Sequence, residues 1–332
     1  MTESHTCSDE HVAIIIPCYN AEPTLAATLA SALAQDAAVE IVVIDDGSRD
    51  GSLAVAREFE PRIRVFSGPN RGVSAARNTG IAETNAPWIV FLDADDLLEP
   101  GTLAKRLACA RASDAEVVSC DWMDIVDDGA GNLTDGAYRS IDWSALEANP
   151  ELATATHVWA TTAAILYHRK IVDRIGGFRP CLHNIQDARF LFDAAYHGAR
   201  FGRSDHIGAR YRILPGSLSR RDPVRFSRDI LLNGQQIEKA WRARGSLDLK
   251  RLKAVQGIYN TAGLNLFRVS HPSYFEAVES QRKLGLPLPL HSRVAPIAAR
   301  LFGLRGARTL ATVFGRLARG SGCYRRVRLH LS

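Results

Sequence analysis

Glycine is missing from the part of the chain where several classes of nucleotide-binding enzyme need it. Residues 11–25 contain no glycine, whereas a dinucleotide-dependent dehydrogenase carries GxGxxG directly after its first strand. A sugar-phosphate nucleotidylyltransferase also usually opens on a glycine-rich phosphate loop. The absence argues against a dehydrogenase, and a nucleotidylyltransferase remains an alternative for a nucleotide site in this chain.

Paired cysteines and long apolar runs are also lacking. The six cysteines are scattered, without a CxxC pair or a histidine at zinc-finger spacing, so we predict neither a disulfide framework nor a structural zinc site. No apolar run reaches the roughly 18 residues of a membrane span, and residues 1–11 lack the features of a secretory signal. With 332 residues and 46% hydrophobic content, we expect a cytoplasmic globular protein of about two domains.

Acidic residues are absent after Glu279, where eleven basic residues follow. The whole chain has a net charge of +5, so the first 279 residues carry 5 − 11 = −6. Such a tail predicts an anionic partner. The candidates are a phospholipid surface, a nucleic acid, or an acidic patch on this or another protein. Because aromatics do not alternate with the basic residues, no nucleic acid is expected, and a non-enzymatic nucleic-acid-binding protein is only an alternative.

The segment Thr309–Arg319 has the pattern of a helix that lies in a membrane interface. Its apolar face carries Leu310, Val313, Phe314 and Leu317, and its basic face carries Arg308, Arg316 and Arg319. This pattern predicts peripheral attachment to the anionic inner face of the cell membrane. Packing of the tail on the acidic body of the protein is the alternative.

Buried strands alternate with amphipathic helices, which predicts an α/β fold with a mostly parallel sheet flanked by helices. Pro17 is expected to end the first strand. The predicted strands are Val12–Ile16, Glu40–Ile44, Ile63–Phe66, Trp88–Leu92 and Glu116–Cys120. The predicted helices are Glu22–Gln35, Gly51–Glu60, Ser74–Glu83, Thr102–Ser113 and Arg189–Tyr196, and Asp127–Gly136 is predicted to be a loop.

Three regions are expected along the chain. Residues 1–10 form a disordered N-terminus, and residues 11–225 form the α/β domain, with halves at 11–125 and 126–225. Residues 226–332 form a mainly helical extension that ends in the basic tail.

Three carboxylates follow the strand at Trp88–Leu92. The strand leads into Asp93, Ala94, Asp95 and Asp96, and ligands bind beside the carboxyl ends of strands in open α/β sheets. Carboxylates this close repel each other, so they favour a hard cation, Mn²⁺ or Mg²⁺, carrying a diphosphate. A solvated acidic turn is the alternative.

Two other strand ends are expected at the same edge. Tyr19 follows the first strand and can lay its ring against a nucleobase, while Asp46 follows the second and can accept a hydrogen bond from a base. Gly72 permits close backbone approach before a helix N-terminus, and Arg77 is suited to phosphate. Ordinary turn, cap and surface roles are the alternatives for these residues.

Taken together, these segments resemble the bacterial family-2 glycosyltransferases. The resemblance covers roughly residues 11–215 and rests on IIIPCYNAEPTLAATLASALAQ, IVVIDDGSRDGS, NRGVSAARNTGI and FLDADDLLEP, in that order. It implies a GT-A fold, with residues 11–125 as the donor half and 126–225 as the acceptor half. It also implies inverting transfer from a nucleotide diphosphate sugar, most simply a UDP-sugar, to a glycan or lipid-linked acceptor in surface polysaccharide assembly.

The resemblance also implies roles for the donor-half residues. Tyr19 would stack on the base and Asp46 would hydrogen-bond it, while Asp93 would lie near the ribose and the metal. Asp95 would coordinate the divalent ion. The other donor-binding positions are Pro17, Gly72, Arg77 and Ala94.

An acceptor-side motif is suggested by IGGFRPCLHNIQDARFLFDAAYHG, which begins at Ile175 and includes Gly177. Asp187 matches the position that serves as the base in the family, although the preceding residue is Gln186 where the family has glutamate. The alternative is that Asp187 only caps a helix. Trp159 is expected to stack on a sugar on the acceptor side, with a core role as its alternative.

A second departure concerns the metal. Many relatives have a histidine shortly after a Tyr-Arg pair, and this chain has Leu214 there. Leucine cannot bind a cation, so either the ion is held by Asp95, the diphosphate and water, or His206 or His183 substitutes.

Overall fold

The computed structural model describes residues 10–128, 132–214 and 221–320, without the side chains of residues 290 and 313–320. Two compact units divide between Arg221 and Asp222. The boundary expected at 225/226 therefore lies within the first turn of a helix, α10 (Pro223–Ala243), which belongs wholly to the second unit. Of the expected disordered segment 1–10, only Glu10 is among the described residues, and it forms an ion pair with Arg111.

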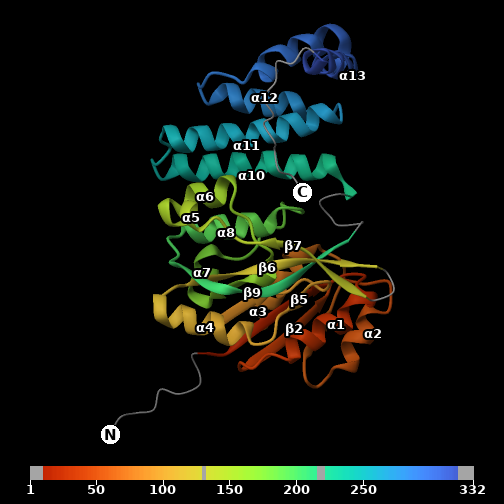
Figure 1. Ribbon diagram of the computed structural model, residues 1–332, viewed down its shortest axis with the longest axis vertical. Coiled ribbons are helices and arrows are strands. Elements are labelled where there is room, and N and C mark those ends of the chain that lie inside the picture. The colour runs from red at the N-terminus through yellow and green to blue at the C-terminus, as the bar shows by residue number, and fades with distance from the viewer. Residues whose placement is uncertain (1–9, 129–131, 215–220, 321–332) are drawn as a thin grey trace. The chain divides into compact units, whose positions relative to one another are not determined.

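The donor half of the first unit is a parallel sheet, seen in red and orange in Figure 1. Its strand order is β3 (Arg64–Ser67), β2 (Val39–Asp45), β1 (Val12–Cys18) and β4 (Trp88–Phe91). Every residue of β1 is buried, as its run of β-branched residues predicts. Pro17 does not end β1, because it stays paired in register with Ile44 and the strand continues to Cys18.

Four helices connect the strands in this part of the chain. They are α1 (Glu22–Leu33), α2 (Ser52–Glu58), α3 (Val73–Ala82) and α4 (Thr102–Ser113). All four were expected from the apolar periodicity, with boundaries that differ by at most two residues. Pro23 stands in the first turn of α1, where its missing N–H costs no helical hydrogen bond.

The acceptor half extends the same sheet with mixed pairing. The sheet continues through β8 (Ile165–His168), β6 (Val117–Asp127), β9 (Phe201–Ile213) and β5 (Leu97–Leu98), while β7 (Leu133–Arg139) pairs with β6. β8 pairs antiparallel with β4 on one side and with β6 on the other, whereas β6 and β9 pair parallel. The parallel arrangement is thus confined largely to the donor half. The predicted loop at Asp127–Gly136 is wrong at both ends, because Asp127 is the last residue of β6 and Leu133 onward is strand β7.

Short helices cover the acceptor half. They are α5 (Trp143–Ala148), α6 (Pro150–Thr156), a 3₁₀ turn at Thr162–Ala164, α7 (Arg169–Ile175) and α8 (Gln186–Tyr196). Phe190 of α8 stacks on Phe178 at 4.1 Å between ring centroids and meets Phe91 of β4 edge-on at 5.7 Å. This aromatic contact fixes α8 over the end of β4, which is the strand that leads into the acidic residues.

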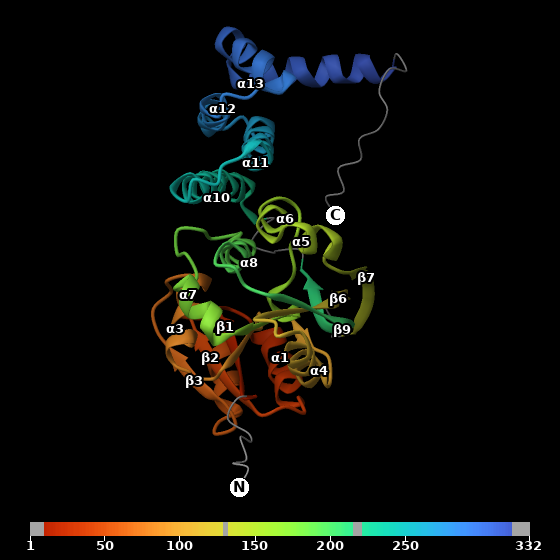
Figure 2. The ribbon, with the colours of Figure 1, turned by 90° about the vertical axis from the view of Figure 1, so that its left-hand side faces the viewer.

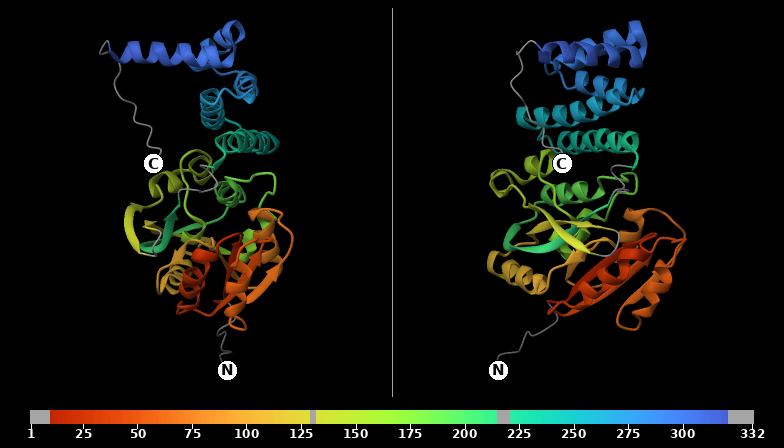
Figure 3. Two further views of the ribbon diagram at one scale, coloured as in Figure 1. Left: turned by 90° about the vertical axis from the view of Figure 1, so that its right-hand side faces the viewer. Right: turned by 45° about the vertical axis from the view of Figure 1, so that its right-hand side comes forward.

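The second unit is helical, as the sequence predicts. It consists of α10, α11 (Leu249–Arg268), α12 (Ser273–Lys283) and α13 (Leu290–Gly320), which follow one another in chain order in Figures 2 and 3. Asp222 and Asp248 cap α10 and α11 by accepting hydrogen bonds from Arg225 N and Arg251 N. None of the helices in the described ranges is both long enough and apolar enough to cross a bilayer.

Candidate active site

The carboxyl ends of β2, β1 and β4 meet at one edge of the sheet, because β1 lies between the other two and pairs parallel with both. Hydrogen bonds tie the first two ends together. Asn20 N donates to Ser48 Oγ at 3.0 Å, and Asn20 Oδ1 accepts from Arg49 N at 2.8 Å. Tyr19 beside them is 44% exposed, so its ring is free to stack on a planar ligand.

Asp46 holds the loop before α3. Its two carboxylate oxygens accept hydrogen bonds from Arg71 N and Gly72 N, each at 2.8 Å. Gly72 has a φ of 89° and precedes the first residue of α3, so a residue with a side chain would be strained there. Each carboxylate oxygen keeps a second lone pair, and recognition of a base by Asp46 stays a prediction.

Arg77 orients Asp93. Its Nη2 lies 2.5 Å from Asp93 Oδ1, and its guanidinium lies 5.0 Å from the centroid of the Phe178 ring. The arginine is 1% exposed, whereas the side chain of Asp93 is 34% exposed. In the described part of the chain, Arg77 Nε and Nη1 have no hydrogen-bond partner. Arg77 is therefore a buried support for Asp93, and its contact with a diphosphate stays a prediction.

The three acidic residues after β4 have different surroundings. Asp96 is buried and accepts hydrogen bonds from Arg212 N at 2.9 Å and Thr161 Oγ1 at 3.1 Å. Burial is the main reason that its pKa is raised. The buried Ala94 between the other two is held through its carbonyl, which accepts from Thr28 Oγ1 at 3.0 Å. These contacts fix the turn and leave Asp93 and Asp95 partly exposed.

Asp95 has the electrostatics of a cation ligand. Burial first and the negative charge of Asp93 second raise its pKa to about 6. A divalent cation beside both carboxylates would relieve this repulsion, and hard oxygen ligands suit Mn²⁺ or Mg²⁺. Within residues 10–128, 132–214 and 221–320, no group of three or more His, Cys, Asp or Glu side chains is arranged to hold a metal. The residues fit an ion that takes further ligands from a diphosphate and water.

The two histidines that could substitute as metal ligands have different surroundings. His206 of β9 has both ring nitrogens engaged, with Thr102 Oγ1 at 3.0 Å and Ser204 Oγ at 3.1 Å. Burial lowers its pKa. His183 is exposed ahead of α8. His206 is therefore engaged within the fold, and metal binding by His183 stays a prediction.

Asp187 lies in the first turn of α8 and within electrostatic reach of the donor residues. Its Oδ2 accepts a hydrogen bond from Trp159 Nε1 at 2.9 Å, and its Oδ1 accepts from Ala188 N at 2.8 Å. Its pKa is raised, mainly by burial, although the Trp159 hydrogen bond and the charge of Arg77 act in the opposite direction. A carboxylate with a raised pKa retains a captured proton better, which suits a general base.

Trp159 joins Asp187 to an aromatic group. Its ring meets Trp122 and Tyr211 edge-on, with centroids 5.7 and 5.9 Å apart, and it is 39% exposed. The core alternative for Trp159 is thus wrong. Tyr211, the first residue of the Tyr-Arg pair, was not predicted as a site residue, but its contact with Trp159 places it beside Asp187. Burial, followed by the charges of Asp96 and Asp93, raises the pKa of its hydroxyl.

Gly177 shapes the turn before α8. Its φ is 97°, and a Cβ there would lie 2.7 Å from Asn78 Oδ1. Asn78 of α3 donates to Phe178 O at 2.9 Å and accepts from Phe178 N at 2.7 Å. This pair of hydrogen bonds joins the acceptor-side turn to the helix that carries Arg77. Contact of Gly177 with an acceptor stays a prediction.

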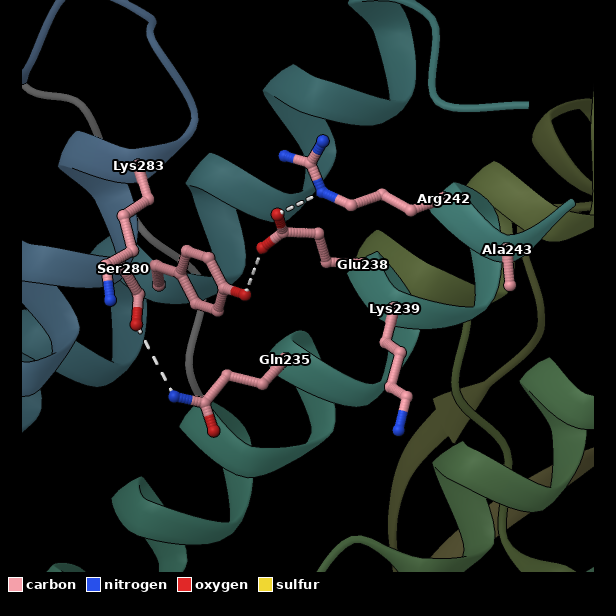
Figure 4. A pocket seen from close by; sticks show the side chains of 8 residues that line it. Gln235, Glu238, Lys239, Arg242, Ala243, Ser280 and Lys283 are labelled. Carbon is pink, nitrogen blue, oxygen red and sulfur yellow. Dashed lines mark hydrogen bonds and ion pairs between the residues drawn. The ribbon is translucent and has the colours of Figure 1, made fainter. Parts of the chain in front are cut away.

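The helical unit contains a separate hollow of about 610 Å³, shown in Figure 4. Glu238 in it accepts hydrogen bonds from Tyr259 Oη at 2.6 Å and Arg242 Nε at 2.7 Å. Lys239 and Lys283 also line it. Of the residues that the structure describes, Glu238 is the one carboxylate that lines this hollow, and it is already hydrogen-bonded. The end of β4 instead carries three aspartates, so we do not assign the reaction to this hollow.

The model of the family described as "Glycosyl transferase family 2" matches residues 13–180, about half of the chain. The chain belongs to this family. The match includes every predicted donor-side residue, as well as Trp159 and Gly177, and it ends before Asp187. Membership argues against the nucleotidylyltransferase and nucleic-acid-binding alternatives, and it confirms the family predicted from the motifs.

Two relatives come from Rhizobium meliloti. The succinoglycan biosynthesis protein ExoO is 30% identical over 223 residues, which cover 63% of this chain and 62% of ExoO. The succinoglycan biosynthesis protein ExoU is 48% identical over 101 residues, or 29% of this chain and 30% of ExoU. The matched region thus spans less than two thirds of either relative.

Solved structures confirm the fold class. S. aureus TarS 1–349 in complex with UDP-GlcNAc aligns with a TM-score of 0.66 at 19% identity, covering 95% of this chain and 93% of that one. The mannosyltransferase PcManGT from Pyrobaculum calidifontis, in complex with GDP-Man and Mn²⁺, aligns with a TM-score of 0.54 at 19% identity, covering 93% and 87%. The predicted GT-A architecture with a helical C-terminal region is therefore present.

Proposed function

We propose that this protein is an inverting glycosyltransferase that moves a sugar from a nucleotide diphosphate sugar to a hydroxyl acceptor. The observation that carries the proposal is the position of Asp187, whose pKa responds to the charges of both Arg77 and Asp93. Two carboxylate groups with separate surroundings therefore serve one site. The partly exposed pair Asp93 and Asp95 suits the donor, and Asp187 beside Trp159 suits the acceptor.

The proposed reaction is a direct displacement at the anomeric carbon. Asp187 takes the proton of the acceptor hydroxyl, whose oxygen forms a bond to the anomeric carbon as the bond to the diphosphate oxygen breaks. The products are the glycosylated acceptor and a nucleoside diphosphate. The exposed face of Trp159 would bind a sugar ring, and its Nε1–H holds the Asp187 carboxylate in place.

On the donor side, Tyr19 and Asp46 would bind the base. Pro17 in β1, Gly72 before α3 and Ala94 after β4 would form the floor of the donor site. Asp95, with Asp93, would hold Mn²⁺ or Mg²⁺. When bound, such an ion neutralises charge on the departing diphosphate. PcManGT, which shares the fold, was solved with GDP-Man and Mn²⁺, and this supports the metal assignment.

We further propose a UDP-sugar donor and a glycan or lipid-linked acceptor in bacterial surface polysaccharide assembly. TarS structures with UDP and UDP-GlcNAc support the nucleotide, and the names of ExoO and ExoU support the setting. A lipid-linked acceptor would place the protein in the cytoplasm, at the inner face of the membrane. The basic tail would supply that contact. Within Thr309–Arg319, the side chains from residue 313 onward lie outside the described part of the chain.

Thermal-shift measurements with UDP-, GDP- and dTDP-sugars, each with and without Mn²⁺, test the donor. A ligand selective for the native state raises its apparent stability, by about 2.7 kcal/mol at one hundred times its Kd. We expect a UDP-sugar with Mn²⁺ to give the largest shift. If no nucleotide sugar shifts the melting temperature under either condition, the protein does not bind a donor and the proposal is wrong.

Asp187→Asn tests the base. The amide is nearly isosteric but cannot accept the acceptor proton, so we expect the turnover number to fall by roughly 10²- to 10⁴-fold. The thermal shift with a UDP-sugar should stay that of the parent. Asp173→Asn is the matched control, because Asp173 is an exposed aspartate of α7 and its replacement should leave turnover unchanged. Equal turnover in parent and Asp187→Asn would show that another group is the base.

A further inference from the structure

Helix α13 presents an apolar stripe to solvent. Val294, Ile297 and Leu301 are 55%, 61% and 71% exposed. At about 100° per residue these three fall within an arc of roughly 60° on one face of the helix. Phe302, which is 61% exposed, follows directly. We call these four residues the α13 stripe.

The opposite face of α13 already serves the core of the helical unit. Ala299 and Ala307 are buried in a cluster with residues of α11 and α12, namely Leu266, Phe267, Tyr274 and Val278. Ser292 is fully buried as well. The stripe is therefore not needed to attach α13 to its own unit, and an exposed apolar patch of this kind marks an interaction surface.

Two arginines border the stripe, and two more follow it along the chain. At the same spacing Arg293 and Arg300 fall beside Ile297, between the stripe and the buried face. Arg305 and Arg308 follow the helix break at Gly303, whose φ is 69°. Arg293 Nε and Arg308 Nη1 each donate a hydrogen bond to a backbone carbonyl, of Leu288 and Arg268 respectively. No ion pair of these four arginines is found among the described residues, and the chain has no acidic residue after Glu279, so their charge is not neutralised from within α13.

We propose that the α13 stripe and its four arginines dock on an anionic lipid bilayer. The combination of an apolar stripe, cationic flanks and no acidic residue is complementary to anionic headgroups over acyl chains. The inference deepens the membrane contact proposed above and moves its centre from Thr309–Arg319 to Val294–Phe302. It does not depend on the transferase reaction, because no residue of the candidate active site takes part.

Vesicle flotation of the full chain tests this proposal. The vesicles are phosphatidylcholine alone or a mixture with phosphatidylglycerol, and the proteins are the parent, Ile297→Gln/Leu301→Gln and Arg300→Gln/Arg305→Gln. Glutamine is a good helix former, so the helix should be retained. Leu249→Gln is the control, because Leu249 is a 56% exposed apolar residue of α11. Circular dichroism and thermal unfolding check that each variant folds as the parent does.

We expect the parent and Leu249→Gln to float with anionic vesicles and bind neutral ones much more weakly. The double apolar variant should lose about tenfold or more in partitioning, and the arginine variant should lose about fivefold per arginine. Equal flotation of the parent and the double apolar variant would overturn the proposal. A second outcome would also overturn the proposal. If the parent does not bind vesicles and sedimentation equilibrium shows that it is a dimer while the double apolar variant is a monomer, the stripe joins two copies of the chain. Thermal shifts with a UDP-sugar report on donor binding separately, so failure of one proposal does not affect the other.

Discussion

At the scale of single residues, Asp187 is held between opposing influences. Burial favours its protonated form, while the hydrogen bond from Trp159 Nε1 and the positive charge of Arg77 favour its ionised form. The net result is a raised pKa, so the carboxylate holds a captured proton better than an exposed aspartate does. Trp159 thus contributes an electrostatic effect as well as an aromatic surface.

Replacing Trp159 by phenylalanine should shift the pH profile. The substitution removes an N–H donor that stabilises the ionised carboxylate, so the pKa of Asp187 rises further. Because a base works only when ionised, activity is lost as the pH falls through that pKa, and the acidic limb of kcat/KM should move to higher pH. Above the limb, the lost ring contact should lower kcat/KM by about two- to tenfold.

The control for this profile is Trp143→Phe, because Trp143 is a partly buried tryptophan of α5 that is not one of the candidate site residues. Its acidic limb should coincide with that of the parent. If Trp159→Phe lowers kcat/KM equally at every pH, Trp159 acts only as a contact surface and does not tune Asp187.

Local sequence pointed to the donor-side candidates but not to the residues that support them. Asp93 and Asp95 could be recognised because they follow a buried strand directly along the chain. Tyr211 and Thr161 reach the site only through the pairing of β9 and the turn before β8, and both contacts join residues far apart in sequence. Such contacts leave no local pattern, so single-sequence reasoning could not find them.

At the scale of elements, the turn before α8 depends on Gly177. Gly177→Ala places a Cβ 2.7 Å from Asn78 Oδ1 at a φ of 97°. The strain and the disturbed pairing of Asn78 with Phe178 should lower the free energy of unfolding by about 1–3 kcal/mol, measured by urea denaturation. Gly68→Ala is the control, because a Cβ there meets nothing within 4 Å and its φ is ordinary. Equal midpoints for the two variants would contradict this account.

Most elements of the donor half followed from the sequence because they are buried strands or amphipathic helices, although the short strand β3 is only half-buried or exposed. The acceptor half was harder. β7 is largely exposed and reads LTDGAYR, without an apolar face, and its strand conformation depends on pairing with β6. The long strand β9 alternates irregularly because its pairing with β6 shifts register near Asp121. Neither strand carries the alternation that identifies a half-buried strand.

At the scale of the whole molecule, the two units have separate cores. The main core cluster lies within residues 12–209, while a second cluster joins α11, α12 and α13. All predicted donor and acceptor residues belong to the first unit, and the α13 stripe belongs to the second. Binding a nucleotide sugar should therefore stabilise only one of two cooperative regions.

Differential scanning calorimetry of the full chain checks this expectation. We expect two transitions, of which a UDP-sugar with Mn²⁺ raises only the one that belongs to the first unit, because binding to the native state stabilises only the region that binds. Gly177→Ala identifies that transition, since its strain lies in the first unit and should lower the same peak. A single transition that moves as a whole would show that the units unfold together. If the nucleotide instead raised the peak that Gly177→Ala leaves unchanged, the donor would bind to the helical unit.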